Sequence, residues 1–325
     1  MFTYHLNLLT LLELNSVGRR TVQQLLLSCD RTLFSEQPLH AKSEILRFLF
    51  RLPGDQELAR ARKQADAIVD HAHKAGVQLI GFGEDRYPQR LAALSDFPVI
   101  LFIRGNPEAL QQQKTISIIG SRTASPKVLQ LTETYARRLA EKGWYLVSGL
   151  TEGCEAAAHR GTLQAARPGT AVLGSGLDQI HPRRSTRLAK EILEKGGCWI
   201  SEHPNGTSAR KRRLIERDRI RSALSAGVLL IQASFSSHAM HTVRLAKSQG
   251  SPLDVLDPSH AAISGDSTGN NFLVKARAAV PIQSNADLES YIENLSRQLA
   301  APDIKTVSNI QPLADPVQLR LWEER

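Results

Sequence analysis

The chain has 325 residues, more than one domain usually needs, so we expect two domains or one domain with an appendage. Apolar residues make up 42% of it and charged residues 22%, which is enough apolar material for a sizeable core. Lys and Arg number 41 against 32 Asp and Glu, and the resulting formal charge of +9 favours an anionic partner such as nucleic acid.

The cysteines and the hydropathy pattern indicate a cytoplasmic protein. Cys29, Cys154 and Cys198 are far apart and show no CxxC spacing, which argues against a disulfide framework or a zinc site. The amino-terminal residues lack the basic region of a signal peptide. No apolar run approaches the roughly 18 residues that a membrane-spanning helix needs. We therefore expect no membrane association.

Residues 1–78 are predicted to form a small helical domain. Leucines recur there at helical spacing, and the stretch from 59 to 75 is rich in Ala, Arg and Lys. The segment "LNSVGRRTVQQLL" (14–26) has an apolar helix end, a turn at Gly18 and a second helix opening at Thr21. It resembles a SAM-like or helix-hairpin-helix element, whose turn can offer backbone N–H groups to a phosphate. A packing unit that touches no DNA is the alternative.

From about residue 79, apolar runs alternate with amphipathic stretches. This pattern predicts strands at 116–121, 144–148, 170–174, 198–201, 228–232 and 253–256, and helices at 126–142, 154–166, 184–195, 215–226 and 239–249. Such alternation is typical of an α/β fold, a Rossmann-like, mostly parallel sheet with helices on both faces. We assign this domain to residues 79–285, and residues 286–325 to a short helix (288–299) and a tail.

Gly and Ser gather at the predicted carboxyl ends of the strands, where open α/β sheets bind ligands. These ends are Gly120–Arg122, Ser148–Gly153, Gly174–Gly176, Ser201–Glu202 and Ser234–Ser237. In "KTISIIGSRTASP" (114–126), an apolar run ends in Gly120, Ser121 and Arg122, and Ser125 and Pro126 have the character of a helix cap and first turn. A glycine, a hydroxyl and a cation at the start of a helix predict an anion site.

The basic stretch "RKRRLIERDRIR" (210–221) is the second notable feature. Such runs are usually solvated helix faces. Arg217, however, shares a helix face with Ile220 and Leu224, which should turn inward. It also lies near the predicted start of the helix, where the macrodipole disfavours a cation. Arg217 therefore needs an anionic companion, either an internal carboxylate such as Glu202 or a bound phosphate.

Enzymatic sites are poorly supported by the sequence. "GSGLDQ" (174–179) lacks the third glycine of a dinucleotide loop, and no Walker motif is present. Ser148 does not lie in a nucleophile elbow. His159 has the context of a structural hydrogen-bonding residue more than of a base, and His238 and His241 have no third metal ligand nearby in sequence. We expect no catalytic residue, no metal and no cofactor.

The ordered motifs resemble those of the DprA/Smf family of bacterial DNA-processing proteins, from about Arg86 to Ala279. The matching segments are "RYPQRLAALSDFPVILFIRGN", "IIGSRTAS", "LVSGLTEGCEAAAHRGTL", "TAVLGSGLDQIHP", "ISEHPNGT", "IERDRIRSALSAGVLLIQA" and "STGNNFLVKARA". The resemblance implies a protein that binds single-stranded DNA in a basic pocket, forms homodimers and loads the RecA recombinase during transformation or repair. The DNA-binding residues it predicts are Gly120, Ser121, Arg122, Ser148, Gly149, Lys211, Arg212, Arg213, Arg217, Arg219, Ser237 and Thr242.

Several positions depart from the family pattern. The family's GID reads Gly153-Cys154-Glu155, its RNR reads Arg217-Asp218-Arg219, a glycine after Ser237 is replaced by His238, and a Pro-Gly reads Pro258-Ser259. We expect this chain to lack the carboxyl-terminal winged helix that many members carry. These departures predict weakened or respecified DNA binding. With few aromatic residues for base stacking, binding should rest on phosphate charge and depend steeply on salt.

Two alternatives remain from the sequence. A DprA-like antitoxin or regulator in a phage-defence toxin–antitoxin module would use the same fold to bind a toxin partner, and the missing winged helix motivates this hypothesis. A nucleotide-cleaving enzyme related to the LOG-type phosphoribohydrolases would need a PGGxGT–E loop, and the nearest stretch, "SGDSTGNN", lacks its paired glycines and its glutamate.

Overall fold

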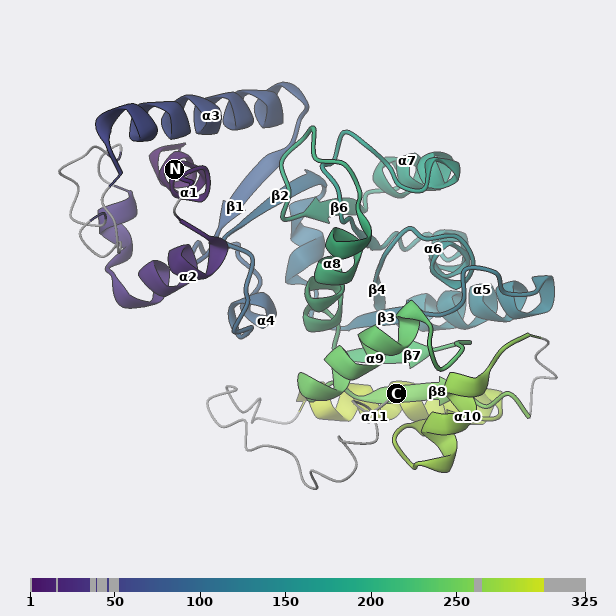
Figure 1. Cartoon of the computed structure of the whole chain (residues 1–325). Coiled ribbons are helices and arrows are strands. Elements are labelled where there is room, and N and C mark those ends of the chain that lie inside the picture. The colour runs from purple at the N-terminus through teal and green to yellow at the C-terminus, as the bar shows by residue number, and fades with distance from the viewer. Residues whose placement is uncertain are drawn as a thin grey trace.

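The computed structural model describes residues 2–15, 17–35, 39, 46, 53–259 and 265–300. Helices α1 (Phe2–Leu12), α2 (Arg19–Ser28) and α3 (Asp55–Lys74) precede the sheet and lie to one side of it (Figure 1). Leu8, Leu11, Val22 and Leu25 build their common core. The predicted amino-terminal helices are thus confirmed. Helix α2 begins at Arg19, two residues before the predicted Thr21. The predicted tail lies outside the described residues beyond 300.

A nine-stranded sheet forms the centre of the described part of the chain, in the order β1-β2-β6-β5-β4-β3-β7-β8-β9. Its strands are β1 (Gln78–Gly81), β2 (Ile100–Gly105), β3 (Thr115–Ile119), β4 (Tyr145–Ser148), β5 (Thr170–Val172), β6 (Cys198–Ser201), β7 (Gly227–Leu230), β8 (Leu253–Leu256) and β9 (Val280–Ile282). From β6 to β9 all pairings are parallel, whereas β1 pairs with β2 and β2 pairs with β6 in antiparallel fashion. The mostly parallel sheet is as predicted, whereas the antiparallel strands β1 and β2 at its edge were not predicted.

Helices cover both faces of the sheet, which confirms the Rossmann-like α/β prediction. One face packs against α5 (Pro126–Glu141), α6 (Cys154–Gln164), α7 (Thr186–Glu194) and α11 (Asn285–Ala300). The other packs against α4 (Gln89–Ala92), α8 (Lys211–Leu224), α9 (His238–Ser248) and α10 (Thr268–Lys275). Among the described residues there are also short 3-10 turns, η1 (Arg31–Phe34), η3 (Pro107–Gln111) and η4 (Arg183–Ser185).

Helix α8 differs from the others because its second half is buried although it is rich in charge. Arg217, Asp218, Arg219 and Arg221 all lie below the surface, at 0–8% exposure. Figure 1 shows the reason: α8 lies against the middle of the sheet and beside α9. Its buried charges need partners within the fold.

The direction in which strands are added to the sheet reverses at β3, which has β4 on one side and β7 on the other. After β3 the chain builds β4, β5 and β6 on one side, and then returns to build β7, β8 and β9 on the other. In open α/β sheets, a crevice for ligands forms beyond the carboxyl ends of the strands at such a point.

Among the helices of the described ranges, none has the length and apolarity needed to cross a bilayer.

Candidate functional site

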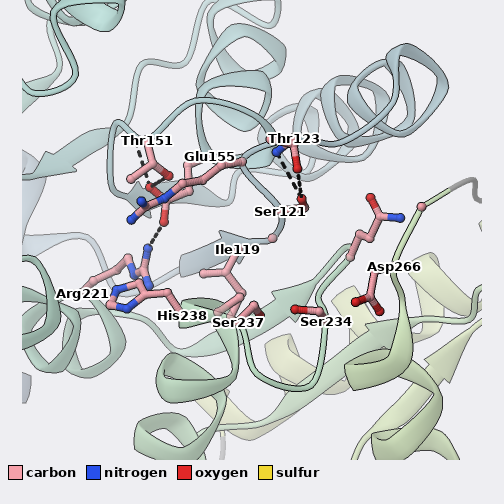
Figure 2. A pocket seen from close by; sticks show the side chains of 15 residues that line it. Ile119, Ser121, Thr123, Thr151, Glu155, Arg221, Ser234, Ser237, His238 and Asp266 are labelled. Atoms are coloured by element: carbon pink, nitrogen blue, oxygen red, sulfur yellow. Dashed lines mark hydrogen bonds and ion pairs between the residues drawn. The ribbon is translucent and has the colours of Figure 1, made fainter. Parts of the chain in front are cut away.

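A crevice of about 500 Å³ opens at the switch point, beyond the carboxyl ends of β3 and β7 (Figure 2). Four loops line it. The loop after β3 contributes Gly120 to Thr123, the β4–α6 connection contributes Thr151, the β7–α9 loop contributes Ser234 and Ser237, and the segment before α10 contributes Gly265 and Asp266. Three of the five predicted Gly- and Ser-rich strand ends therefore meet in one place.

The other two predicted strand ends are occupied by contacts within the fold. Gly174 packs against the backbone of Arg213 and Leu214, and the Gly176 N–H donates to the Thr207 carbonyl at 2.8 Å. Ser201 is buried, and its hydroxyl donates to the Ser175 carbonyl at 2.7 Å. Neither end lines the crevice.

The loop after β3 has the geometry that its sequence predicts. The Ser125 hydroxyl accepts a hydrogen bond from the Val128 N–H at 3.4 Å, and Pro126 is the first residue of α5. The Ser121 hydroxyl accepts from the Thr123 N–H at 3.1 Å. Arg122 is exposed on the crevice wall, and within the described residues its guanidinium has no hydrogen-bond or ion-pair partner. An unpaired cation, two hydroxyls and a helix start therefore face the same space.

Glycine is required where this loop meets α6. Gly153, the N-cap residue of α6, has φ +82, and a Cβ there would overlap the Ser121 carbonyl oxygen. The Cys154 N–H donates to the same oxygen at 3.0 Å. A Cβ on Gly120 would lie 2.7 Å from the Cys154 sulfur. The anion-facing loop is thus held directly against the first turn of α6.

A buried ion network forms the floor of the crevice. Glu155 accepts hydrogen bonds from the Thr151 N–H at 3.0 Å and from its hydroxyl at 2.5 Å, and forms an ion pair with Arg221. Asp218, fully buried, pairs with Arg217 at 3.1 Å, with Arg221 at 3.0 Å and with His238 at 2.7 Å. Figure 2 shows Glu155, Arg221 and His238 converging on the side of the crevice away from Asp266.

The network holds both carboxylates in their charged form. Burial alone would raise the pKa of Glu155, but Arg221 and Arg217 outweigh burial and lower the pKa to about 2. Burial is likewise outweighed at Asp218, where Arg221 and the hydrogen bond with His238 lower the pKa. The floor is therefore a set of fixed, mutually neutralising charges.

The structure places several predicted DNA-binding residues inside the fold. The Ser148 hydroxyl donates to the Ile118 carbonyl at 2.9 Å, and Thr242 bonds with Asp218 and Arg221. Gly149 is a close-approach position, because a Cβ there would overlap the guanidinium of Arg217. Arg217 is 2% exposed and also donates to the Val172 carbonyl at 2.7 Å.

Of the two predicted companions for Arg217, an internal carboxylate or a bound phosphate, the structure supplies a carboxylate, but not Glu202, the residue suggested as an example. Glu202 pairs with Arg219 at 2.6 Å and with Arg19 at 3.1 Å, and Asp96 joins the same cluster. Glu155 and Asp218 pair with Arg217 instead. The second cluster ties α2 to α8, so Arg219 links the helical segment to the sheet.

The remaining predicted residues face solvent or the crevice. Gly120, Ser121, Arg122 and Ser237 line the crevice. Lys211 and Arg212 are exposed at the start of α8, and Arg213 is half-buried and donates to the Ser208 carbonyl at 2.8 Å. The sequence reasoning missed Thr123, Arg221 and Asp266. Arg221 could have been found, since it lies one helical turn after Arg217 on the same inward stripe.

The histidines considered in the sequence analysis make contacts within the fold. His159 is fully buried, burial lowers its pKa to about 4, and its Nε2 lies 3.1 Å from the Gly149 carbonyl oxygen, an arrangement typical of a structural histidine. The rings of His238 and His241 stack at 6.1 Å. In the part of the chain that the structure describes, no three His, Cys, Asp or Glu side chains are placed to hold a metal ion.

Comparison with known proteins assigns the family. The family model of DNA recombination-mediator protein A matches residues 78–293. The chain belongs to this family. It is 34% identical over 233 residues to Protein Smf of Escherichia coli (strain K12), and 31% identical over 209 residues to DNA processing protein DprA of Bacillus subtilis (strain 168). These matches cover 72% and 64% of this chain but 62% and 66% of the relatives, so the chain spans somewhat under two thirds of their length.

Two solved structures share the architecture. The X-ray structure of DprA from Streptococcus pneumoniae superposes with a TM-score of 0.72 at 24% identity, covering 86% of this chain and 95% of that one. A DprA structure from Helicobacter pylori, whose study concerns its single-stranded DNA binding mode, superposes with a TM-score of 0.60 at 27% identity, covering 68% and 96%. The predicted DprA/Smf resemblance and fold are thus confirmed.

Proposed function

We propose that this protein binds the phosphates of single-stranded DNA at the crevice, as a non-enzymatic component of DNA processing and recombination. The observation that carries the proposal is the exposed Arg122, which has no partner among the described residues and lies beside the Ser121 and Thr123 hydroxyls at the start of α5. Family membership and the net charge of +9 support it, as does the DNA binding for which the Helicobacter pylori relative was studied.

The crevice is suited to holding an anion without transforming it. Its hydroxyls and the Arg122 cation can donate to phosphate oxygens, while the Glu155 and Asp218 carboxylates are engaged by arginines and remain charged. The exposed Lys211 and Arg212, with Arg213, extend the basic surface along the start of α8. Ser148, Arg217, Arg219 and Thr242 act in this proposal by positioning the loops from below.

Fluorescence anisotropy with a short labelled single strand tests the proposal. Wild type should bind in a salt-sensitive manner, with log K falling against log salt at a slope near −2 if about three phosphates are contacted. Arg122→Ala should weaken binding to all sequences alike. Arg137→Ala removes the same charge from an exposed site on α5 and serves as the control. Salt-independent binding, or equal loss in both variants, contradicts the proposal.

We extend the proposal to RecA loading by a homodimer, on the strength of the family assignment alone. Light scattering tests the dimer, and RecA filament assembly on coated single strands tests the loading. In this proposal the Arg122→Ala variant stays dimeric but does not support assembly, which separates DNA binding from self-association.

One observation favours a second candidate, a DprA-like regulator that binds a toxin partner. Glu155, Asp218 and His238, which depart from the family pattern, all join the network that engages Arg217 and Arg221 internally. Fewer arginines then face a DNA strand. Absence of DNA binding at low salt, together with co-purification of a stoichiometric partner from the native host, would favour this second function.

A further inference from the structure

A second hollow lies at the opposite edge of the sheet from the crevice. It is a groove of about 1070 Å³ at the amino ends of β8 and β9, bordered by the end of α9 and the last turns of α11. Its walls are largely apolar and include Leu253, Val274 and Leu295. Val280, one of the few large apolar side chains left exposed on the described residues, adds to the wall at 61% exposure.

The groove contains a buried carboxylate that has no partner among the described residues. Asp254 alternates along β8 with the core residues Leu253 and Val255, so its side chain lies on the sheet face that α11 covers. It is 7% exposed, and among the described residues its carboxyl has no hydrogen-bond or ion-pair partner. Burial raises its pKa to about 7. An isolated buried carboxylate is costly, and native folds rarely leave one unsatisfied.

A buried hydroxyl adds to the polar floor of the groove. Tyr291 of α11 is 2% exposed, and its hydroxyl has no hydrogen-bond partner in the described part of the chain. Burial and the charge of Asp254 both raise the pKa of this phenol. A carboxylate and a phenol that both lack partners within the described ranges indicate a ligand that donates hydrogen bonds and carries positive charge.

The rim of the groove has the opposite charge. Lys247, Arg277 and Arg297 surround its mouth. Such a rim repels a free small cation but suits a peptide in which a basic side chain is flanked by apolar residues and followed by acidic ones. The segment 319–324 of this chain reads LRLWEE, with Arg320 between Leu319 and Leu321, then Trp322 and two glutamates.

We propose that segment 319–324 docks in the groove of its own chain, with the Arg320 guanidinium donating to Asp254 and the leucines and Trp322 covering the apolar walls. Helix α11 ends at Ala300, and Arg297 and Gln298 in its last turn already line the groove. The residues between Ala300 and Arg320 can extend by up to roughly 65 Å, at about 3.3 Å each, so the segment can return to the groove. The glutamates then meet the basic rim. This inference is independent of DNA binding.

Trp322 provides the test in the full chain. The sequence has three tryptophans, and Trp144 and Trp199 are buried at 1% and 4% exposure, so the difference between wild type and Trp322→Phe isolates the third. Acrylamide should quench Trp322 much less in the intact protein than in a free peptide of residues 315–325. Asp254→Asn and Arg320→Gln should each raise quenching to the level of the peptide, and the double variant should raise it no further.

Controls decide between docking and its alternatives. Lys305→Ala removes a charge elsewhere in the same part of the chain and should leave Trp322 protected. Circular dichroism melts verify that each variant is folded. Peptide-like quenching of Trp322 in wild type, an equal effect of Lys305→Ala, or protection that disappears on dilution would each overturn the proposal. The last result would mean that the segment comes from a second copy.

Discussion

The two edges of the sheet handle buried charge in opposite ways. At the carboxyl edge, Glu155 and Asp218 are buried among arginines, hydroxyls and a histidine, and their pKa values are lowered. At the amino edge, Asp254 is buried without a described partner, and its pKa is raised to about 7. Burial by itself therefore does not determine whether a carboxyl group is charged. The charged and hydrogen-bonding partners within the fold determine whether a buried carboxylate is stabilised internally or requires a ligand.

The largest expected effect comes from breaking the network at the carboxyl edge. Asp218→Ala leaves Arg217 and Arg221 buried with one carboxylate between them, and removal of one partner from a buried ion pair typically costs about 3–5 kcal/mol. Urea denaturation measures the loss. Glu141→Ala breaks an exposed pair with Arg137 and should cost less than about 1 kcal/mol. Equal losses would show that the network is not a buried unit.

The second expected effect is a difference in how the stability contributed by each edge depends on pH. The lowered pKa values of Glu155 and Asp218 mean that their pairing stabilises the fold above pH 4.5, the usual pKa of a glutamate, and that this stability is lost as the pH falls toward 2. The contribution of Asp254 to stability depends on pH in the opposite direction. Because its carboxyl pKa is raised, stability is lost as the pH rises from 3.8 toward 7.

Arg320→Gln, which by our inference leaves Asp254 alone, should therefore unfold at lower urea at pH 8 than at pH 5. The double variant Arg320→Gln/Asp254→Asn should lose this difference. If the single variant shows the same pH profile as wild type between pH 5 and 8, then Arg320 does not compensate Asp254.

A third prediction concerns the loop that faces the crevice. Gly153→Ala should destabilise the fold by about 1–3 kcal/mol and weaken DNA binding, because the added Cβ meets the Ser121 carbonyl oxygen and displaces the loop. Gly143→Ala is a matched control, since Gly143 has φ +87 but no atom within 4 Å of the added Cβ. The control also places an alanine at a positive φ and should keep DNA affinity, measured by anisotropy. Equal DNA affinity in the two variants would mean that the loop does not contact DNA.

The smallest effect is expected at the start of α8. Arg212 is exposed and pairs with Glu216 at 2.8 Å, so Arg212→Ala should leave stability unchanged within about 0.5 kcal/mol. If Arg212 contacts one phosphate, the slope of log K against log salt should become less steep by about 0.7. An unchanged slope would exclude the start of α8 from the DNA surface.

Much of the architecture could be predicted because it rests on local patterns. The alternation of apolar runs and amphipathic stretches located the six strands from β3 to β8, and Ser125 and Pro126 marked the start of α5. Three strands were not separately predicted: β1 at one edge, its neighbour β2, and β9 at the other edge. Only short turns and a four-residue helix separate β1 from β2, so no long helix indicates a crossover between them. Domain boundaries remain predictions, although α11 buries Leu288, Ile292 and Leu295 against the sheet.

The candidate site was predictable to the level of single loops but not of pairings. Helical periodicity showed that Arg217 faces inward and needs a carboxylate. It suggested Glu202 as an example and did not identify Glu155 and Asp218, because the pairing depends on how α6 and α8 meet across the sheet. The burial of Asp254 could not be predicted, since a single aspartate in "LDVL" is also compatible with a strand position that faces solvent.

The network beneath the crevice also constrains how this sequence can vary. Asp218 forms ion pairs with Arg217, Arg221 and His238. A neutral residue at position 218 therefore removes a carboxylate partner from two buried arginines, unless position 221 becomes neutral as well. Glu155 is bound to the same arginines. Substitutions at positions 155, 218, 221 and 238 are therefore coupled. A single substitution destabilises the fold, whereas a compensating pair of substitutions is tolerated. Descendants of this chain should carry the network whole or replace it whole.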